Sequence, residues 1–372
     1  MRRIRTTRGF SLLELLVVVT ILVLLIGFAV PAFSSILGSV ERSIAENQLR
    51  IGISAGRDAA IANVLGDGAA VFMFEPGGRM SIVPCREITR VRDRLPFIDP
   101  QTGTRDVTRS VFIPVADSEP IQLPKGWSIR GYAPPGRIHK RSGAGANPNG
   151  WYEGDELWGE LNGGGAWLFP ENGFFNPIVG ADGANRQSFM IRFRSGTGEV
   201  VTDNVDVCLF LDPSPESDFR NVEPWRSSPR LDRAEDLELA VRRTAATVND
   251  ALTSTPPQPQ FFGILGDEAT DTVLVGPVIA LGLYEEAKMA AGIGLRGLNR
   301  TTKSIYQADP NDARLPAPVP EFDATLRTSF GNGQTISNQI NAWMVGLLPN
   351  VESDVKLFVV QVNTAELEEL NP

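Results

Sequence analysis

One apolar run near the amino terminus constrains this chain more than any other feature of the sequence. Residues 15–40 contain no charged side chain, and residues 15–30, LLVVVTILVLLIGFAV, are almost wholly aliphatic. As a helix, residues 15–30 would span about 24 Å and residues 10–30 about 31 Å, which is the thickness of a bilayer core. We therefore expect a transmembrane helix over residues 10–33.

The placement of charge gives this helix a direction. The first nine residues contain four arginines and no acid, although the whole 372-residue chain has a net charge of −9. Without these arginines, 31 basic residues stand against 44 acidic ones, a balance of −13. Basic residues that precede an apolar span remain in the cytoplasm. We therefore expect a single-pass inner-membrane protein with a cytoplasmic N-terminus and an exported, periplasmic head. The four arginines are Arg2, Arg3, Arg5 and Arg8.

An acid, Glu14, lies within the expected helix. An acidic side chain inside an apolar span costs a few kcal/mol, so it normally has a partner. Cleavage between Gly9 and Phe10 would create an α-ammonium group four residues before Glu14. In an assembly, the Glu14 carboxylate would then neutralise the amine of a neighbouring subunit. Because a buried ion pair can fix register, we expect Glu14 to set the register of such an assembly.

Two other interpretations of this segment remain. An ordinary secretory signal would be cut after Ala32, which ends a small-residue site at residues 30–32. The mature chain would then be an exported carbohydrate-binding or hydrolytic protein. A plain signal anchor is the second alternative. Glu14 argues against the secretory signal, since its apolar region gains nothing from a carboxylate.

Residues 8–16, RGFSLLELL, resemble the class III leader of type IV pilins and pseudopilins, and Pro31 falls where many of these helices carry a proline. The resemblance implies that a prepilin peptidase cleaves after Gly9 and that Phe10 is N-methylated. It also implies that the helix assembles with other pilins or pseudopilins. The expected role is structural, in a type II secretion or type IV pilus-like apparatus, and not enzymatic.

The apolar pattern continues beyond Pro31 as far as residue 65. Apolar residues at spacings of three, four and seven mark one helix face, which we expect to pack on a sheet. Residues 66–68, Gly-Asp-Gly, would end the helix. Strands are then expected over residues 69–74 and 80–83 as a hairpin. The residues of this expected face are Leu37, Val40, Ile44, Ile51, Ala55, Ala59 and Ala62.

Residues 57–63, RDAAIAN, with the strand that follows, resemble the GspH/FimT group of minor pseudopilins. Residues 189–198, a strand and a glycine-containing turn, resemble the same group, with a returning strand expected over residues 205–211. The resemblance implies an α+β fold, in which a long N-terminal helix packs on an antiparallel sheet.

The expected organisation has five parts. A cytoplasmic leader (1–9) and the transmembrane helix (10–33) precede the exported half of the helix (34–66). A β-rich head (67–212) follows, with a loop-rich insertion at about 86–186, and then a mixed α/β extension (213–372). In the extension, helices are expected over residues 232–248 and 283–291, and strands over 272–275, 278–283 and 356–362.

Few other residues offer chemistry. Cys85 and Cys208 would be exported, so they are a candidate disulfide, with two separate buried thiols as the alternative.

The acids of residues 153–160 lie among aromatic residues but lack the fixed separation of a glycosidase pair, and no calcium-loop spacing is present. His139 has no acid or nucleophile beside it. Nucleic acid is disfavoured as a partner, although residues 137–141 are basic as in DNA-uptake pilins, because the body is acidic. No cofactor or metal is expected.

Overall fold

The computed structural model describes residues 12–64, 66–75, 79–99, 103–115, 118–133, 138–139, 151–152, 166–168, 187–203, 207–211, 272–294, 306–308, 316–318, 336–348, 351 and 353–370. The chain divides into two compact units, residues 1–46 and residues 47–372. The cleavage site at Gly9 and Phe10, the acids of residues 153–160 and the helix expected over residues 232–248 lie outside the described residues.

One helix, α1 (Leu12–Ala62), runs through the end of the first unit and into the second. Its 51 residues include almost all of the expected helix, which was placed at residues 10–65. In the first unit, Arg42 and Glu46 form an ion pair of 3.5 Å at the i, i+4 spacing that stabilises an exposed helix. The helix stops just before residues 66–68, where two glycines disfavour further helical turns.

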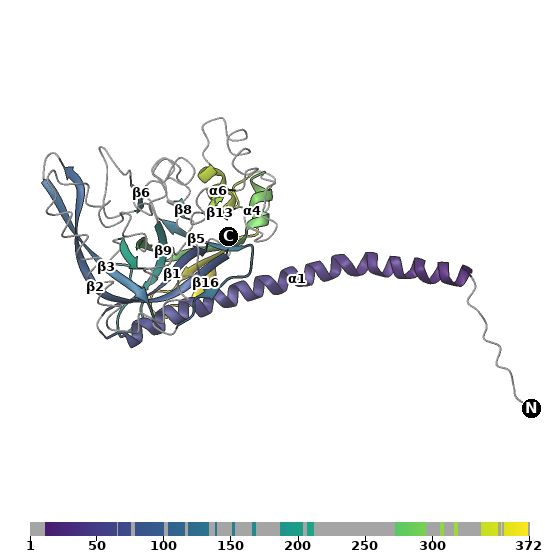
Figure 1. The fold of residues 1–372 in the computed structure, drawn as a ribbon, viewed down its shortest axis with the longest axis horizontal. Helices are drawn as coiled ribbons and strands as arrows, with labels where there is room; N and C mark the ends of the chain where they lie inside the picture. The colour runs from purple at the N-terminus through teal and green to yellow at the C-terminus, as the bar shows by residue number, and fades with distance from the viewer. Residues whose placement is uncertain are drawn as a thin grey trace, which may run out of the picture. The chain divides into compact units, whose positions relative to one another are not determined.

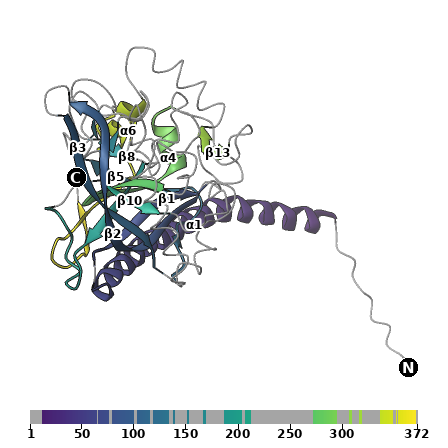
Figure 2. The same cartoon turned by 60° about the vertical axis from the view of Figure 1, so that its left-hand side comes forward.

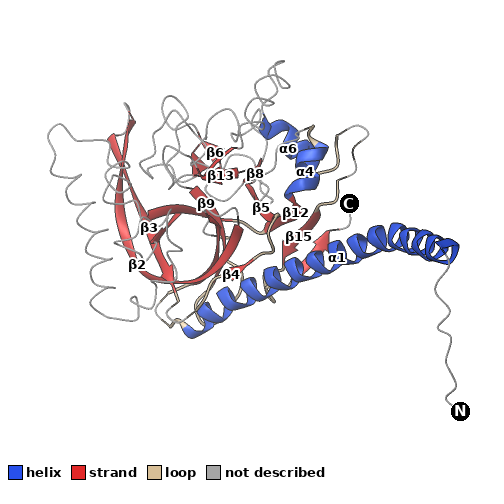
Figure 3. Ribbon diagram, turned by 45° about the vertical axis from the view of Figure 1, so that its right-hand side comes forward, coloured by secondary structure: helices blue, strands red, loops and turns tan. Residues whose placement is uncertain are grey.

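The second unit is built on a sheet that closes on itself. Strand β1 (Gly68–Glu75) pairs with β2 (Arg79–Asp99) on one side and with β9 (Gln187–Phe193) on the other. From β9 the order runs through β11 (Thr272–Pro277), β10 (Cys208–Leu211) and β3 (Gly103–Pro114) back to β2. A short strand, β4 (Ile121–Gln122), adds to β2. Figure 3 shows these strands curving around a common axis.

The length of β2 makes the closure possible. Its first part pairs with β1, and the part from Cys85 onward pairs with β3. The register shifts between Glu87 and Thr89, and such irregularities bend a strand. In both Figure 1 and Figure 2, β2 and β3 lie side by side as a long hairpin.

The interior of the closed sheet is filled by side chains from all six of its strands. Along β1, residues at alternate positions point inward, as the two-residue repeat of a strand requires. The buried cluster is apolar apart from two thiols. Its members are Ala69, Val71, Met73, Val83, Cys85, Phe112, Met190, Cys208, Phe210 and Val275.

A second, antiparallel sheet lies against the first. Its order is β16 (Leu367–Leu370), β15 (Lys356–Val360), β12 (Ala280–Glu285), β5 (Trp127–Ala133) and β8 (Ala166–Leu168). The two sheets approach closely at Gly131, where a Cβ atom would lie 2.7 Å from the Phe189 ring. Phe189 in turn stacks on Phe72, with ring centroids 4.8 Å apart.

Two short helices and two short ladders complete the described structure. Helix α4 (Glu286–Gly292) follows β12 directly, and α6 (Ile336–Met344) packs near β8. Strand β6 (Ile138–His139) pairs with β7 (Trp151–Tyr152), and β13 (Tyr306–Ala308) pairs with β14 (Pro316–Pro318). His139 therefore belongs to a two-residue strand.

The expected α+β fold, a long N-terminal helix packed on β-sheet, is confirmed. The first hairpin, the strand at residues 189–192 and the strands and helix expected between residues 272 and 291 all form. The expected antiparallel pairing is not kept throughout, because β10–β3 and β11–β9 pair in parallel. The closed sheet is thus mixed rather than antiparallel.

The segment expected as a returning strand does not pair with β9. Strand β10 forms at residues 208–211, but β11 lies between it and β9. Because β11 comes from the segment expected to be a separate extension, residues beyond 212 complete the head rather than follow it. Likewise, β5 lies within the expected insertion and forms the middle of the second sheet with β12.

The helix face that packs on the sheets is not the expected one. Of the expected residues, Ile44 is 44% exposed and Ile51 57% exposed, whereas Leu49 and Ile53, which were not expected, are buried. The packed face also carries Gly52, Gly56 and Ala60. A Cβ atom at Gly56 would lie 2.6 Å from the backbone nitrogen of Ala70, so only a face of small residues allows this approach. The packed face therefore combines large buried side chains, Leu49 and Ile53, with glycines at the points where helix and strand approach most closely.

Candidate functional site

The first candidate site is the apolar beginning of α1. Every side chain from residue 12 to residue 28 is exposed, and the large apolar ones range from 46% exposed at Val17 to 82% at Leu12. An exposed apolar surface of this size marks a region that contacts protein or membrane. Within the part of the chain that the structure describes, we find no helix both long and apolar enough to cross a membrane.

Glu14 lies in the first turn of α1. A carboxylate there is favoured by the positive end of the helix dipole. It is the sole charged residue of the sequence between residues 9 and 40, so its neighbours along the helix are uncharged. Its expected partner, the amine of a mature Phe10, would belong to another subunit.

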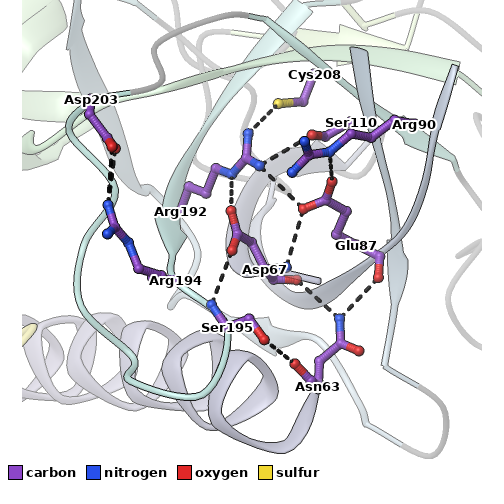
Figure 4. Close-up of polar contacts among 10 residues, drawn as sticks. All are labelled: Asn63, Asp67, Glu87, Arg90, Ser110, Arg192, Arg194, Ser195, Asp203 and Cys208. Atoms are coloured by element: carbon purple, nitrogen blue, oxygen red, sulfur yellow. Dashed lines mark hydrogen bonds and ion pairs between the residues drawn. The ribbon is translucent and has the colours of Figure 1, made fainter. Parts of the chain in front are cut away.

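The second candidate site is a buried polar cluster where α1 ends and the closed sheet begins (Figure 4). At its centre is Arg192 of β9, whose side chain is 1% exposed. Its Nε donates to Asp67 Oδ2 at 2.8 Å, and its Nη2 donates to Glu87 Oε2 at 3.2 Å. The remaining bonds go to Ser110 Oγ at 3.2 Å and Cys208 Sγ at 3.4 Å. One guanidinium thus connects β9 with β2, β3, β10 and the link before β1.

The pattern of the strand explains how a charged group comes to lie inside. Met190 points into the closed sheet, so Arg192, two residues further along β9, points to the same side. The Phe112 ring lies 5.4 Å from the guanidinium and provides a cation–π contact. Arg192 therefore closes one end of the interior with its charge neutralised by carboxylates.

Electrostatics keep these groups charged. Burial alone lowers the pKa of Arg192, but its interactions with Cys208, Asp67 and Glu87 outweigh burial and raise that pKa. Burial alone raises the pKa of Glu87. Hydrogen bonds from Arg90 and Ser110 and the charge of Arg192 outweigh it, so the pKa of this carboxyl lies below its ordinary value. Both shifts favour the charged forms of Arg192 and Glu87 at neutral pH.

The same cluster holds the end of α1. The side-chain amide nitrogen of Asn63, Nδ2, donates to the backbone carbonyl oxygens of Glu87 at 2.9 Å and Asp67 at 3.3 Å. Ser195 Oγ donates to the Asn63 carbonyl at 2.6 Å, and the Ser195 amide donates to Asp67 Oδ1 at 3.0 Å. The amide of Gly196 donates to the Ala60 carbonyl at 3.1 Å. The turn after β9 therefore satisfies carbonyl groups that a helix end leaves open.

These contacts join the two segments that resemble GspH/FimT proteins. Residues 57–62 end α1 and Asn63 follows it directly, while residues 189–198 comprise most of β9 and the turn after it. Asn63 and Ser195 are directly bonded, although they lie 132 residues apart in sequence. The sequence patterns did not indicate Asp67, Glu87 or Arg192 as a cluster. The one available signal was an arginine at an inward position of a strand.

A second buried cluster lies in the antiparallel sheet. The Arg130 Nε donates to the hydroxyl of Tyr284 at 2.9 Å, and Ser128 Oγ donates to the carboxylate of Glu286. Burial raises the pKa of Tyr284 to about 12, despite the opposing charge of Arg130. Trp343 of α6 packs edge-on against Tyr284, with ring centroids 5.8 Å apart. The cluster fixes α4 and α6 on the sheet.

The two cysteines both lie in the interior of the closed sheet and are free thiols in the structure. Cys85 Sγ donates to the Val83 carbonyl at 3.3 Å, while Cys208 accepts from Arg192. Burial raises the pKa of Cys85 well above its ordinary value. Their pairing in an exported chain stays a prediction. Among the described residues, no three Asp, Glu, His or Cys side chains gather as a metal site.

Comparison with known proteins adds to the N-terminal site. A family model described as the prokaryotic N-terminal methylation motif matches residues 4–30. No curated protein and no solved structure matches the chain. The motif is typical of the type IV pilin and pseudopilin superfamily, whose prepilins are anchored in the membrane through the N-terminal helix before assembly. It implies processing by a prepilin peptidase. The chain is a pilin-like protein that carries the prepilin methylation motif.

Proposed function

We propose that this chain is a minor pseudopilin or pilin-like subunit of a type II secretion or type IV pilus-like apparatus. A prepilin peptidase cleaves it after Gly9, Phe10 is N-methylated, and α1 assembles with the helices of other subunits. The observation that carries this proposal is the exposed apolar surface of residues 12–28 of α1, in a chain whose residues 4–30 match the methylation motif. Its role is structural, and it has no enzymatic activity of its own.

Location follows from the same helix. Before assembly, the apolar residues lie in the inner membrane, the arginine-rich leader remains cytoplasmic, and the head is exported to the periplasm. In the assembled state, Glu14 neutralises the amine of a neighbouring Phe10 and sets the register between the two helices. The exposed side of α1, with Ile51 and Ile61, provides further apolar surface toward other subunits.

Within this superfamily, we propose the GspH/FimT group as the subtype. Support comes from the direct contact between residues 57–63 and 189–198, the two segments that carry that resemblance. The turn after β9 caps the end of α1, and this contact gives a role to one residue of each segment. Asn63 bonds to Glu87, and Gly198 adopts a φ of +69° against α1.

The mature N-terminus tests the proposal. Mass spectrometry of the chain purified from membranes is expected to show Phe10, with an added methyl group, as the first residue. A chain that begins at Phe33, or at Met1, would refute it.

A variant tests the role of Glu14. Glu14→Leu is expected to keep the fold of the head and to lose co-purification with sibling subunits, because the amine of Phe10 then lacks its counter-charge. Glu41→Leu, on the same helix outside the apolar run, is the matched control and is expected to co-purify normally. Equal co-purification of both variants would contradict the assembly model.

A further inference from the structure

The end of α1 is held by contacts from several parts of the chain that are distant in sequence. Asp67 lies in the link between α1 and β1, Glu87 in β2, and Arg192 in β9. The Arg192 guanidinium bonds to both carboxylates at once, at 2.8 and 3.2 Å. Arg192 therefore links the Asp67 and Glu87 side chains to each other.

Both carboxylates also accept hydrogen bonds from backbone amides. The amide of Asp67 donates to Glu87 Oε2 at 3.2 Å, and the amide of Glu87 donates to the Asp67 carbonyl at 2.7 Å. Asp67 Oδ1 also accepts the amide of Ser195. The orientation of the link before β1 thus depends on side chains whose own orientation is fixed by Arg192.

The turn at residues 194–199 completes the connection. Gly196 and Gly198 both have positive φ, +74° and +69°, which L side chains rarely adopt. This shape brings the Gly196 amide to the Ala60 carbonyl and places Gly198 against Arg57 and Ile61 of α1. The turn follows β9 directly, so its position also depends on the strand that carries Arg192.

We propose that Arg192, Asp67 and Glu87 form a polar clamp that makes the end of α1, the link before β1 and the 194–199 turn a single rigid joint with the closed sheet. Directional bonds serve this purpose better than apolar contact, because they fix an orientation as well as a separation. When the clamp is removed, the joint opens locally while both sheets remain folded.

The purpose of the clamp rests on the proposed function. A subunit that is held in an assembly through α1 connects to its head at the point where the helix ends. A rigid joint there adds to the packing of residues 49–60 on the sheets in making the head follow the helix. The existence of the clamp can be tested without any assembly.

Hydrogen exchange of the full chain in detergent micelles, followed by mass spectrometry of peptides, tests the clamp. In Arg192→Met, peptides that cover residues 57–67 and 194–199 are expected to exchange about tenfold faster or more, because local opening becomes cheaper than global unfolding. Peptides of β12 and β15 are expected to keep their rates. The matched control is Arg194→Met. Arg194 lies two residues after Arg192 in the sequence, and this change removes only an exposed ion pair with Asp203.

Two results would overturn the proposal. One is an unchanged rate at the joint in Arg192→Met. The other is equal acceleration in the joint and the second sheet, which would make Arg192 a general stabiliser of the fold. If Arg192→Met does not fold, Glu87→Gln, which removes one charge and keeps the shape, must show the same local pattern. An absent Phe10 N-terminus would refute the proposed function and leave this test untouched.

Discussion

Glycine at position 56 allows α1 to reach the sheet, and replacing it provides a quantitative test of the packing. A Cβ atom there would lie 2.6 Å from the nitrogen, 2.8 Å from the carbon and 2.9 Å from the oxygen of backbone groups at Ala69 and Ala70. Ordinary contacts are about 3.5–4.0 Å, so helix and strand would have to separate. No side-chain rotation can relieve this contact, because its partners are backbone atoms.

The magnitude follows from two opposing effects. Alanine favours a helix interior over glycine by about 1 kcal/mol. Overpacking costs about 1–3 kcal/mol, and backbone partners place this site at the upper end. We therefore expect Gly56→Ala to lower the free energy of unfolding by about 2 kcal/mol. The separation is resisted nearby as well, since Gly68 packs against the backbone of Ala60.

A series of three variants isolates the contact. Gly38 has no atom within 4 Å of the added Cβ, so Gly38→Ala is expected to be neutral or to stabilise by up to about 1 kcal/mol. Gly52 meets the Ile82 side chain, which can move in part, so Gly52→Ala is expected to fall between the other two. Urea unfolding followed by tryptophan fluorescence measures all three, because Trp127 and Trp343 are buried. If Gly56→Ala is as stable as Gly38→Ala, helix and sheet do not pack as described.

Two further predictions concern titratable groups. Because the pKa of Glu87 is lowered in the folded state, its contribution to stability is complete above its unfolded pKa of about 4.3 and is lost as the pH falls through the folded value. Unfolding free energies between pH 7 and pH 3 should therefore fall less steeply in Glu87→Gln, and an equal slope in both chains would contradict this account. The thiols of Cys85 and Cys208, both buried, should resist alkylation in the folded chain at pH 8 and react in urea. A chain that reacts in urea only after reduction would instead contain the disulfide.

The strongly patterned elements of this chain were predictable from its residues. The helix of α1, the β1–β2 hairpin and strand β9 depend on local apolar periodicity and on glycine-rich ends, which act over a few residues. The order of strands in the closed sheet was harder to predict. Nothing local indicates that β11 lies between β9 and β10, because more than sixty residues separate β11 from either partner.

The buried face of α1 shows the same limit from another side. The periodic aliphatic residues, with Ile44 and Ile51 among them, mark a real face of the helix, but that face is exposed. The face that packs on the sheet carries Gly52, Gly56 and Ala60 beside Leu49 and Ile53, and the small residues allow the helix and strand backbones to approach closely. The sequence contains both helix faces, and apolar periodicity alone does not indicate which of them packs on the sheet.

The sequence by itself predicts the processing site and determined the apolar helix and the acid within it, because these depend on composition and spacing along one continuous segment. The tertiary structure alone decided that Asp67, Glu87 and Arg192 meet, that both thiols lie inside a closed sheet, and that the last third of the chain supplies one of its strands. Each of these results depends on which strands become neighbours. Strand pairing is a property of the whole fold, whereas a transmembrane or assembly helix satisfies its own backbone and can be recognised alone.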